Sequence, residues 1–124
     1  MNPICTYCGK ESLKVCGKEI YPHRKDLYKK IFYKCNDCNA YVGCHENTDK
    51  PLGILADENL RKIKTMAHRV FDPLWKNNIF LNRLDAYKWL SEKMNIPLSE
   101  CHIGMFNTEQ CLKVIKYCSE KLAL

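Results

Sequence analysis

Two pairs of cysteines, each with two residues between its members, constrain the fold of this 124-residue chain more than any other feature. Cys5 and Cys8 stand in the stretch CTYCG, and Cys35 and Cys38 stand in CNDCN. Two intervening residues allow a tight turn, or knuckle, to aim both sulfurs at one ion, and two knuckles complete a tetrahedron of thiolates. The spacing therefore predicts that these four cysteines bind one structural Zn²⁺.

The residues that follow the knuckles agree with this interpretation. Gly9 follows the first pair and Asn39 follows the second, and both residue types tolerate the positive φ that a knuckle often needs. Two alternatives are buried cysteine pairs without metal and a thioredoxin-like redox motif. Because neither pair is surrounded by a βαβ pattern, the redox motif is the weaker of the two.

Short alternating runs before Pro51 predict β-strands. Leu13 and Val15 alternate with polar neighbours, and two further runs cover residues 29–35 and 39–44, separated by turn-like stretches such as YPHRKD. We therefore expect a zinc ribbon of short antiparallel strands over residues 1–50.

After Pro51 the apolar residues recur at helical spacing. The first predicted helix has Asp57 placed at its N-cap, and Pro73 is expected to end it. Its apolar face comprises Leu60, Ile63, Ala67 and Val70. Residues 51–124 thus form a helical region that begins with this helix.

Two further helices are predicted at capping pairs. Asn82 precedes Asp85 by three residues, and Asn107 precedes Gln110 by the same interval. The residues expected to face inward are Leu84, Tyr87, Leu90 and Met94 in the second helix, and Cys111, Leu112, Val114, Ile115, Cys118 and Leu122 in the third. The sequence therefore predicts an α+β fold: a zinc ribbon and a bundle of about three helices, joined as one compact unit.

Composition and cysteine usage indicate a cytoplasmic protein. The chain is 46% hydrophobic and 27% charged, contains no apolar run long enough to cross a membrane, and begins without the layout of a secretory signal. In a reducing compartment the nine cysteines are expected to be metal ligands or buried small residues. The cysteines outside the knuckles, expected to be buried, are Cys16, Cys44, Cys101, Cys111 and Cys118.

Charge and aromatic residues suggest a nucleic-acid surface. The net charge is +6, and residues 10–34 hold eight basic against three acidic residues, which places most of the excess on the ribbon. Cations can meet phosphates while interleaved rings stack on unpaired bases. The candidate contacts are Arg24, Lys25, Lys29, Lys30, Tyr28 and Phe32. The alternative is a solvated lysine-rich surface with Phe32 and one tyrosine in the core. A second basic cluster lies on the first helix at Arg61, Lys62, Lys64 and Arg69.

Three histidines are possible functional residues. His45 and His102 each follow a cysteine, so a second metal site built from the two Cys-His dipeptides is an alternative to buried cysteines. His68 stands four residues before Asp72, as a general base and its orienting carboxylate would, but a structural role in which Asp72 caps a helix starting at Pro73 is favoured. The chain contains no nucleophile elbow, phosphate loop or paired carboxylates, so we expect no catalysis.

The succession CTYCG, YKCNDCNAYVGCHENTDKPLG, HRVFDPLW and ECHIGMFNTEQC resembles a phage- and prophage-borne zinc-finger-containing family of uncharacterised function. The resemblance covers nearly the whole chain and brings no catalytic residues with it. It implies a zinc-ribbon head on a small helical tail, with Cys5, Cys8, Cys35 and Cys38 at the family's ligand positions. The head alone also resembles the zinc ribbons of primases and topoisomerases, which suggests nucleic acid.

These observations lead to one hypothesis and two alternatives. The hypothesis is a zinc-binding, non-catalytic phage accessory protein in the host cytosol that binds nucleic acid through its basic ribbon. The first alternative is a protein-interaction module or inhibitor acting on a host enzyme or defence complex. The second is a metal-dependent nuclease using His45, His68 or His102.

Overall fold

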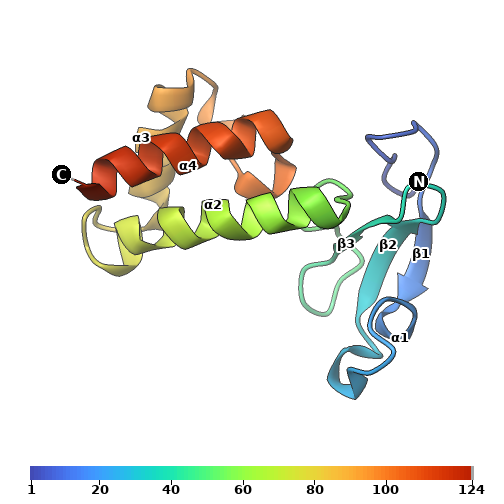
Figure 1. The fold of residues 1–124 in the computed structure, drawn as a ribbon. Helices are drawn as coiled ribbons and strands as arrows, with labels where there is room; N and C mark the ends of the chain where they lie inside the picture. The colour runs from blue at the N-terminus through green and yellow to red at the C-terminus, as the bar shows by residue number, and fades with distance from the viewer. Residues whose placement is uncertain (124) are drawn as a thin grey trace. The chain divides into compact units, whose positions relative to one another are not determined.

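The computed structural model describes residues 1–123 and divides them into two compact units, Met1–Glu58 and the segment from Asn59 onward. The first unit contains a three-stranded antiparallel sheet, and the second contains the long helices (Figure 1). The four-cysteine cluster also belongs to the first unit. The predicted α+β class, with strands at the N-terminus and about three helices after them, is confirmed. Within residues 1–123, no helix is both long enough and apolar enough to span a bilayer.

The sheet is a simple meander of β1 (Leu13–Cys16), β2 (Ile31–Cys35) and β3 (Ala40–Gly43). Both strand pairs are antiparallel, with Tyr33 of β2 opposite Lys14 on one side and Val42 on the other. A short helix, α1 (Gly17–Ile20), and a 3-10 turn, η1 (Lys25–Leu27), connect β1 to β2. The predicted strands at 29–35 and 39–44 are therefore present in slightly shorter form.

The two faces of the sheet carry different clusters, because successive side chains of a strand point to opposite faces. On one face Tyr33, Cys35 and Ala40 are buried with Cys5 and Leu55. On the other face the ring of Phe32 meets Tyr21 and Tyr41 edge-on, at centroid distances of 5.9 and 6.1 Å. β1 lies at the edge of the sheet and is largely exposed, so the expectation that Cys16 is buried is wrong.

The second unit is built from α2 (Glu58–Lys76), α3 (Arg83–Met94) and α4 (Thr108–Ala123). The predicted caps are confirmed: the Asn82 side chain accepts from the Asp85 N–H, and Asn107 and Gln110 exchange reciprocal bonds of 2.9 and 3.1 Å. α3 ends at Met94 and is followed by its C-cap Asn95, whose φ of 57° is the left-handed conformation common at that position.

Helix α2 does not stop at Pro73, contrary to the sequence-based expectation, but continues to Lys76. Proline lacks an N–H and forfeits one helical hydrogen bond. However, Phe71 and Leu74 on either side of it are completely buried, and burial of such a side chain stabilises by about 1.5–3 kcal/mol. Packing therefore keeps this last turn helical, and Asp72 lies inside the helix rather than capping a new one.

The core of the second unit also differs in part from the predicted apolar faces. Tyr87 and Leu90 of α3 are buried as expected, whereas Leu84 of α3 and Leu112 of α4 are more than half exposed. The space is filled instead by the connection between α3 and α4, which contains the 3-10 turns η2 (Leu98–Glu100) and η3 (Ile103–Met105). Its buried residues are Cys101, Ile103 and Phe106.

Candidate metal centre and the cationic end of the ribbon

Each cysteine pair is presented by a backbone turn of the type that the spacing predicted. The first knuckle is closed by bonds from the Gly9 N–H to the Cys5 carbonyl and from the Cys5 N–H to the Lys10 carbonyl, at 2.9 and 2.8 Å. Gly9 has a φ of 77°. The second knuckle is the turn between β2 and β3, where Asn39 has a φ of 50°. Both residues adopt the positive φ expected of them.

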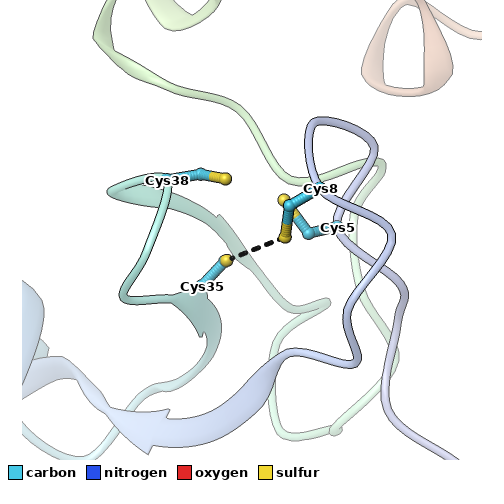
Figure 2. A group of neighbouring side chains, drawn as sticks. All are labelled: Cys5, Cys8, Cys35 and Cys38. Atoms are coloured by element: carbon cyan, nitrogen blue, oxygen red, sulfur yellow. Dashed lines mark hydrogen bonds between the residues drawn. The ribbon is translucent and has the colours of Figure 1, made fainter.

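The two knuckles bring all four cysteine sulfurs to one place, and Figure 2 shows them converging from the N-terminal loop and from the β2–β3 turn. The sulfurs lie within 4.8 Å of one another, and those of Cys8 and Cys35 are 3.6 Å apart. In a tetrahedral zinc site with Zn–S bonds of about 2.3 Å, neighbouring sulfurs are about 3.8 Å apart. The donor set therefore fits Zn²⁺ in number, chemistry and separation.

The thiols of the cluster lie close enough to shift the pKa values of Cys35 and Cys38. The Cys38 N–H, the largest influence, lowers the pKa of the Cys35 thiol by hydrogen bonding to its sulfur. Desolvation, together with the neighbouring thiols, raises the pKa of Cys38 to about 12. Four thiolates crowded together repel one another, and a divalent cation removes that penalty when it binds.

At the other end of β2 lies the cationic loop, residues Arg24–Lys30. The Arg24 guanidinium donates from Nε and Nη2 to the two oxygens of the Asp26 carboxylate, at 2.9 and 2.7 Å, and this pairing lowers the pKa of Asp26. Lys25, Lys29 and Lys30 are exposed, and within the described part of the chain none of them forms an ion pair. The loop therefore presents three lysines with its one acid already paired.

The aromatic candidates of this segment are occupied. Phe32 is buried between Tyr21 and Tyr41, so its ring has no free face for a base. Tyr28 donates its hydroxyl to the Pro22 carbonyl, and the Lys18 ammonium lies 5.8 Å from its ring centroid. The alternative in which Phe32 belongs to the core describes this residue correctly.

The overall charge is distributed differently from the expectation. Residues 1–50, the predicted ribbon, hold nine basic and six acidic side chains, a balance of +3, and residues 51–124 hold eleven and eight, also a balance of +3. The prediction that most of the excess lies on the ribbon is therefore wrong, because several acids of the first unit lie outside residues 10–34. Lys10 pairs with Asp37 and Lys14 with Asp49, at 2.7 and 3.3 Å.

The three histidines have separate surroundings. The His68 Nδ1 lies 3.9 Å from an Asp72 oxygen, and the His102 ring meets Tyr87 edge-on. Among residues 1–123, the knuckle cysteines are the one group of three or more potential metal ligands that lie together. His45 lines a pocket of about 460 Å³ in the first unit, which we name the end pocket. Its other lining residues are Asp26, Lys29, Lys30, Ile31, Cys44, Glu46, Asn47, Thr48 and Leu52.

The end pocket is the candidate site that sequence reasoning missed. Lys29, Lys30 and His45 were each singled out from the sequence, but nothing in it placed them together. The signal was weak because the lining residues Asn47, Thr48 and Leu52 belong to a stretch that contributes to the family resemblance but contains no motif with a known chemical role.

Comparison with known proteins identifies the family. Residues 1–121 match the family described as zinc-finger-containing domain, and the chain therefore belongs to it. No curated protein and no solved structure matches the chain. Family membership and the four-cysteine cluster together indicate zinc binding.

Proposed function

We propose that this member of the zinc-finger-containing family is a non-catalytic zinc-ribbon protein that binds nucleic acid through its cationic loop. The proposal keeps the setting inferred from the sequence, a phage or prophage protein acting in the host cytosol. The observation that carries it is the cluster of exposed Lys25, Lys29 and Lys30 beside an internally paired Asp26. Exposed, unpaired lysines are the groups that contact phosphates and release counterions.

In this proposal the zinc has a structural role. Four cysteine thiolates fill a tetrahedral coordination shell and leave no position for a water or a substrate. The cluster also lies at the Cys35 end of β2, whereas the cationic loop precedes Ile31 at the other end, about 13 Å along the strand. The ion would hold the ribbon in shape, and the contact with phosphates would be made elsewhere.

The test is binding of the zinc-loaded full chain to labelled single- and double-stranded DNA and RNA, followed by fluorescence anisotropy at two salt concentrations. We expect the double variant Lys29→Ala/Lys30→Ala to bind more weakly and to flatten the dependence of log K on log salt by about one to two units. Zinc content and melting temperature should stay close to the wild-type values, because exposed lysines contribute little to folding.

The matched control removes the same charge from α3. Lys88→Ala/Lys93→Ala changes two exposed lysines of the second unit and should leave the salt dependence unchanged. Equal weakening by both double variants would mean that net charge, rather than the cationic loop, drives binding. Absence of salt-sensitive binding by the wild type would refute the proposal. Strands incubated with Mg²⁺ or Mn²⁺ should remain intact, whereas cleavage would favour the nuclease alternative.

One observation favours a second candidate function, a protein-interaction module. The segment between α2 and α3 exposes two apolar side chains, Leu81 at 83% and Ile79 at 45%, and Leu84 in the first turn of α3 is 55% exposed. Large apolar side chains gathered at a surface are typical of sites that bind other proteins. Crosslinking in infected cells would test this function by comparing the wild type with Leu81→Ser. The function requires that proteins crosslinked to the wild type are not crosslinked to the variant.

A further inference from the structure

From its lining residues we infer that the end pocket is a binding site for a nucleoside monophosphate group. This inference deepens the proposed function and rests on it, since the same group ends a phosphorylated nucleic-acid strand. A volume of about 460 Å³ is far larger than an inorganic phosphate needs and lies within the usual range of small-molecule sites. The pocket therefore has room for a base and a sugar as well as a phosphate.

The charges of the pocket favour a ligand with one anionic end and one end bearing hydrogen-bond donors. Lys29 and Lys30 supply two ammonium groups, and the Asp26 carboxylate in the same wall is already held by Arg24. Glu46 remains as an acceptor, and a carboxylate accepts only from donors such as ribose hydroxyls or an exocyclic amino group. A phosphate alone would meet the lysines but leave Glu46 without a partner.

Apolar residues complete the match. Ile31 and Leu52 also line the pocket, and apolar side chains of this kind can pack against the face of a base. His45 and Asn47 add side chains that can both donate and accept hydrogen bonds. The pocket thus offers the three kinds of contact that a nucleotide needs: cations for the phosphate, polar groups for the sugar and base edge, and apolar surface for the ring.

The pocket is also held in shape before any ligand binds. On one side the His45 N–H donates to the Lys50 carbonyl, and the Thr48 hydroxyl donates to the His45 carbonyl, at 2.9 and 2.8 Å. On the other side the Lys30 carbonyl accepts from the Gly17 N–H at 2.8 Å. The Leu52 N–H donates to Gly43 of β3 at 2.9 Å. Preorganised walls lower the entropic cost of binding.

The experiment uses the zinc-loaded full chain and two kinds of titration. Calorimetry with the four nucleoside monophosphates, with inorganic phosphate and with adenosine tests the free ligand. Anisotropy with one oligonucleotide sequence, carrying either a 5′-phosphate or a 5′-hydroxyl, tests the strand end. We expect a nucleoside monophosphate to bind at least about tenfold more tightly than phosphate or adenosine. Each of the smaller ligands lacks one half of the nucleotide, and the loss of one charged hydrogen bond is sufficient for a factor of this size.

A matched pair of leucines provides the variants. Leu52→Asp puts a negative charge in the pocket wall at a residue that is 53% exposed, and Leu13→Asp does the same on β1, outside the pocket, at a residue that is 54% exposed. Leu52→Asp should abolish nucleoside monophosphate binding, whereas Leu13→Asp should leave it unchanged. Both side chains are exposed to the same degree, so a general effect on folding would appear in both variants.

The outcomes separate this inference from the proposed function. If free nucleoside monophosphate binds but a 5′-phosphate does not change strand binding, the ligand is a free nucleotide. If a 5′-phosphate strengthens strand binding and Leu52→Asp removes that effect, the ligand is the strand end. Salt-sensitive binding of the 5′-hydroxyl strand, with no nucleoside monophosphate binding and no preference for the 5′-phosphate, would overturn the inference alone. Equal affinity for inorganic phosphate and nucleoside monophosphate would also overturn it.

Discussion

Replacing Cys35 by serine removes one thiolate from the knuckle cluster and leaves a hydroxyl that binds Zn²⁺ poorly. Cys35 lies at the end of β2 and is buried, with its sulfur 3.6 Å from that of Cys8. The same side chain is part of the buried cluster of the first unit. The substitution therefore removes a metal ligand and leaves a polar group among apolar neighbours.

The magnitude follows from how little else stabilises this cluster. Besides the two ligands Cys5 and Cys35, its buried members are Tyr33, Ala40 and Leu55. Burial of each large side chain contributes about 1.5–3 kcal/mol. A structural zinc contributes on the order of 10 kcal/mol, which is comparable with the entire stability of a typical domain, about 5–15 kcal/mol. We therefore expect Cys35→Ser to lose its zinc and to unfold the first unit.

The second unit should remain folded, because it has a core of its own around Phe71, Leu90 and Phe106. Two measurements resolve the units. A colorimetric zinc assay should give about one equivalent for the wild type and none for the variant. Amide NMR spectra should lose dispersion for residues 1–58 only, and the fluorescence of Trp75 and Trp89, the two tryptophans of the chain, should be retained.

Cys16→Ser is the control, because Cys16 is an exposed cysteine of the same unit and lies outside the cluster. It should keep both the zinc and the dispersed spectrum. Full zinc content in Cys35→Ser, or dispersed signals for Tyr33 and Leu55 in the zinc-free variant, would refute the assignment of the metal centre and of its role in folding.

Two further predictions concern one backbone contact and one titrating group. Gly17→Ala should destabilise the first unit by about 1–3 kcal/mol, because the new Cβ would lie 1.7 Å from the Leu27 carbonyl oxygen. The measurement is the denaturation midpoint of the first unit, monitored by NMR, and an unchanged midpoint would contradict the prediction. Burial, opposed by Asp72, lowers the pKa of His68 below its ordinary value of 6.5, so the folded state favours the neutral imidazole. The contribution of this residue to stability is complete above pH 6.5 and is lost as the pH falls from 6.5 through the lower pKa of the folded state. Tryptophan-monitored urea unfolding at pH 7.5 and 5.5 should show a smaller pH dependence for His68→Gln than for the wild type, and equal dependences would contradict this.

Features governed by neighbours in the chain could be predicted from the sequence. The knuckles require only cysteine spacing and a residue that accepts positive φ, and Gly9 and Asn39 adopt it. The caps at Asn82 and Asn107 require only a side-chain oxygen three residues from the backbone N–H that donates to it. Because these interactions close within a few residues, they do not depend on what the rest of the chain does.

Features governed by packing were decided by the tertiary structure. Pro73 would end an isolated helix, but the burial of Phe71 and Leu74 keeps α2 intact. Phe32 lies between Lys30 and Lys34 in the sequence, as a stacking residue beside phosphate-binding lysines would, yet the sheet turns its ring toward Tyr21 and Tyr41. Periodicity shows which residues share a face, but it does not show whether another element covers that face.

The end pocket is another feature that depends on the tertiary structure rather than on neighbouring residues in the chain. Lys30 precedes β2, and His45 follows β3. Their proximity depends on the antiparallel register of those two strands. It also depends on the loop after β3, which pairs Pro51 with Cys44. Residue types alone determined that the first unit has a metal centre and a cationic loop. Only the register of the sheet placed a histidine, two lysines and an apolar wall around one cavity, because contacts between distant segments depend on the three-dimensional path of the backbone.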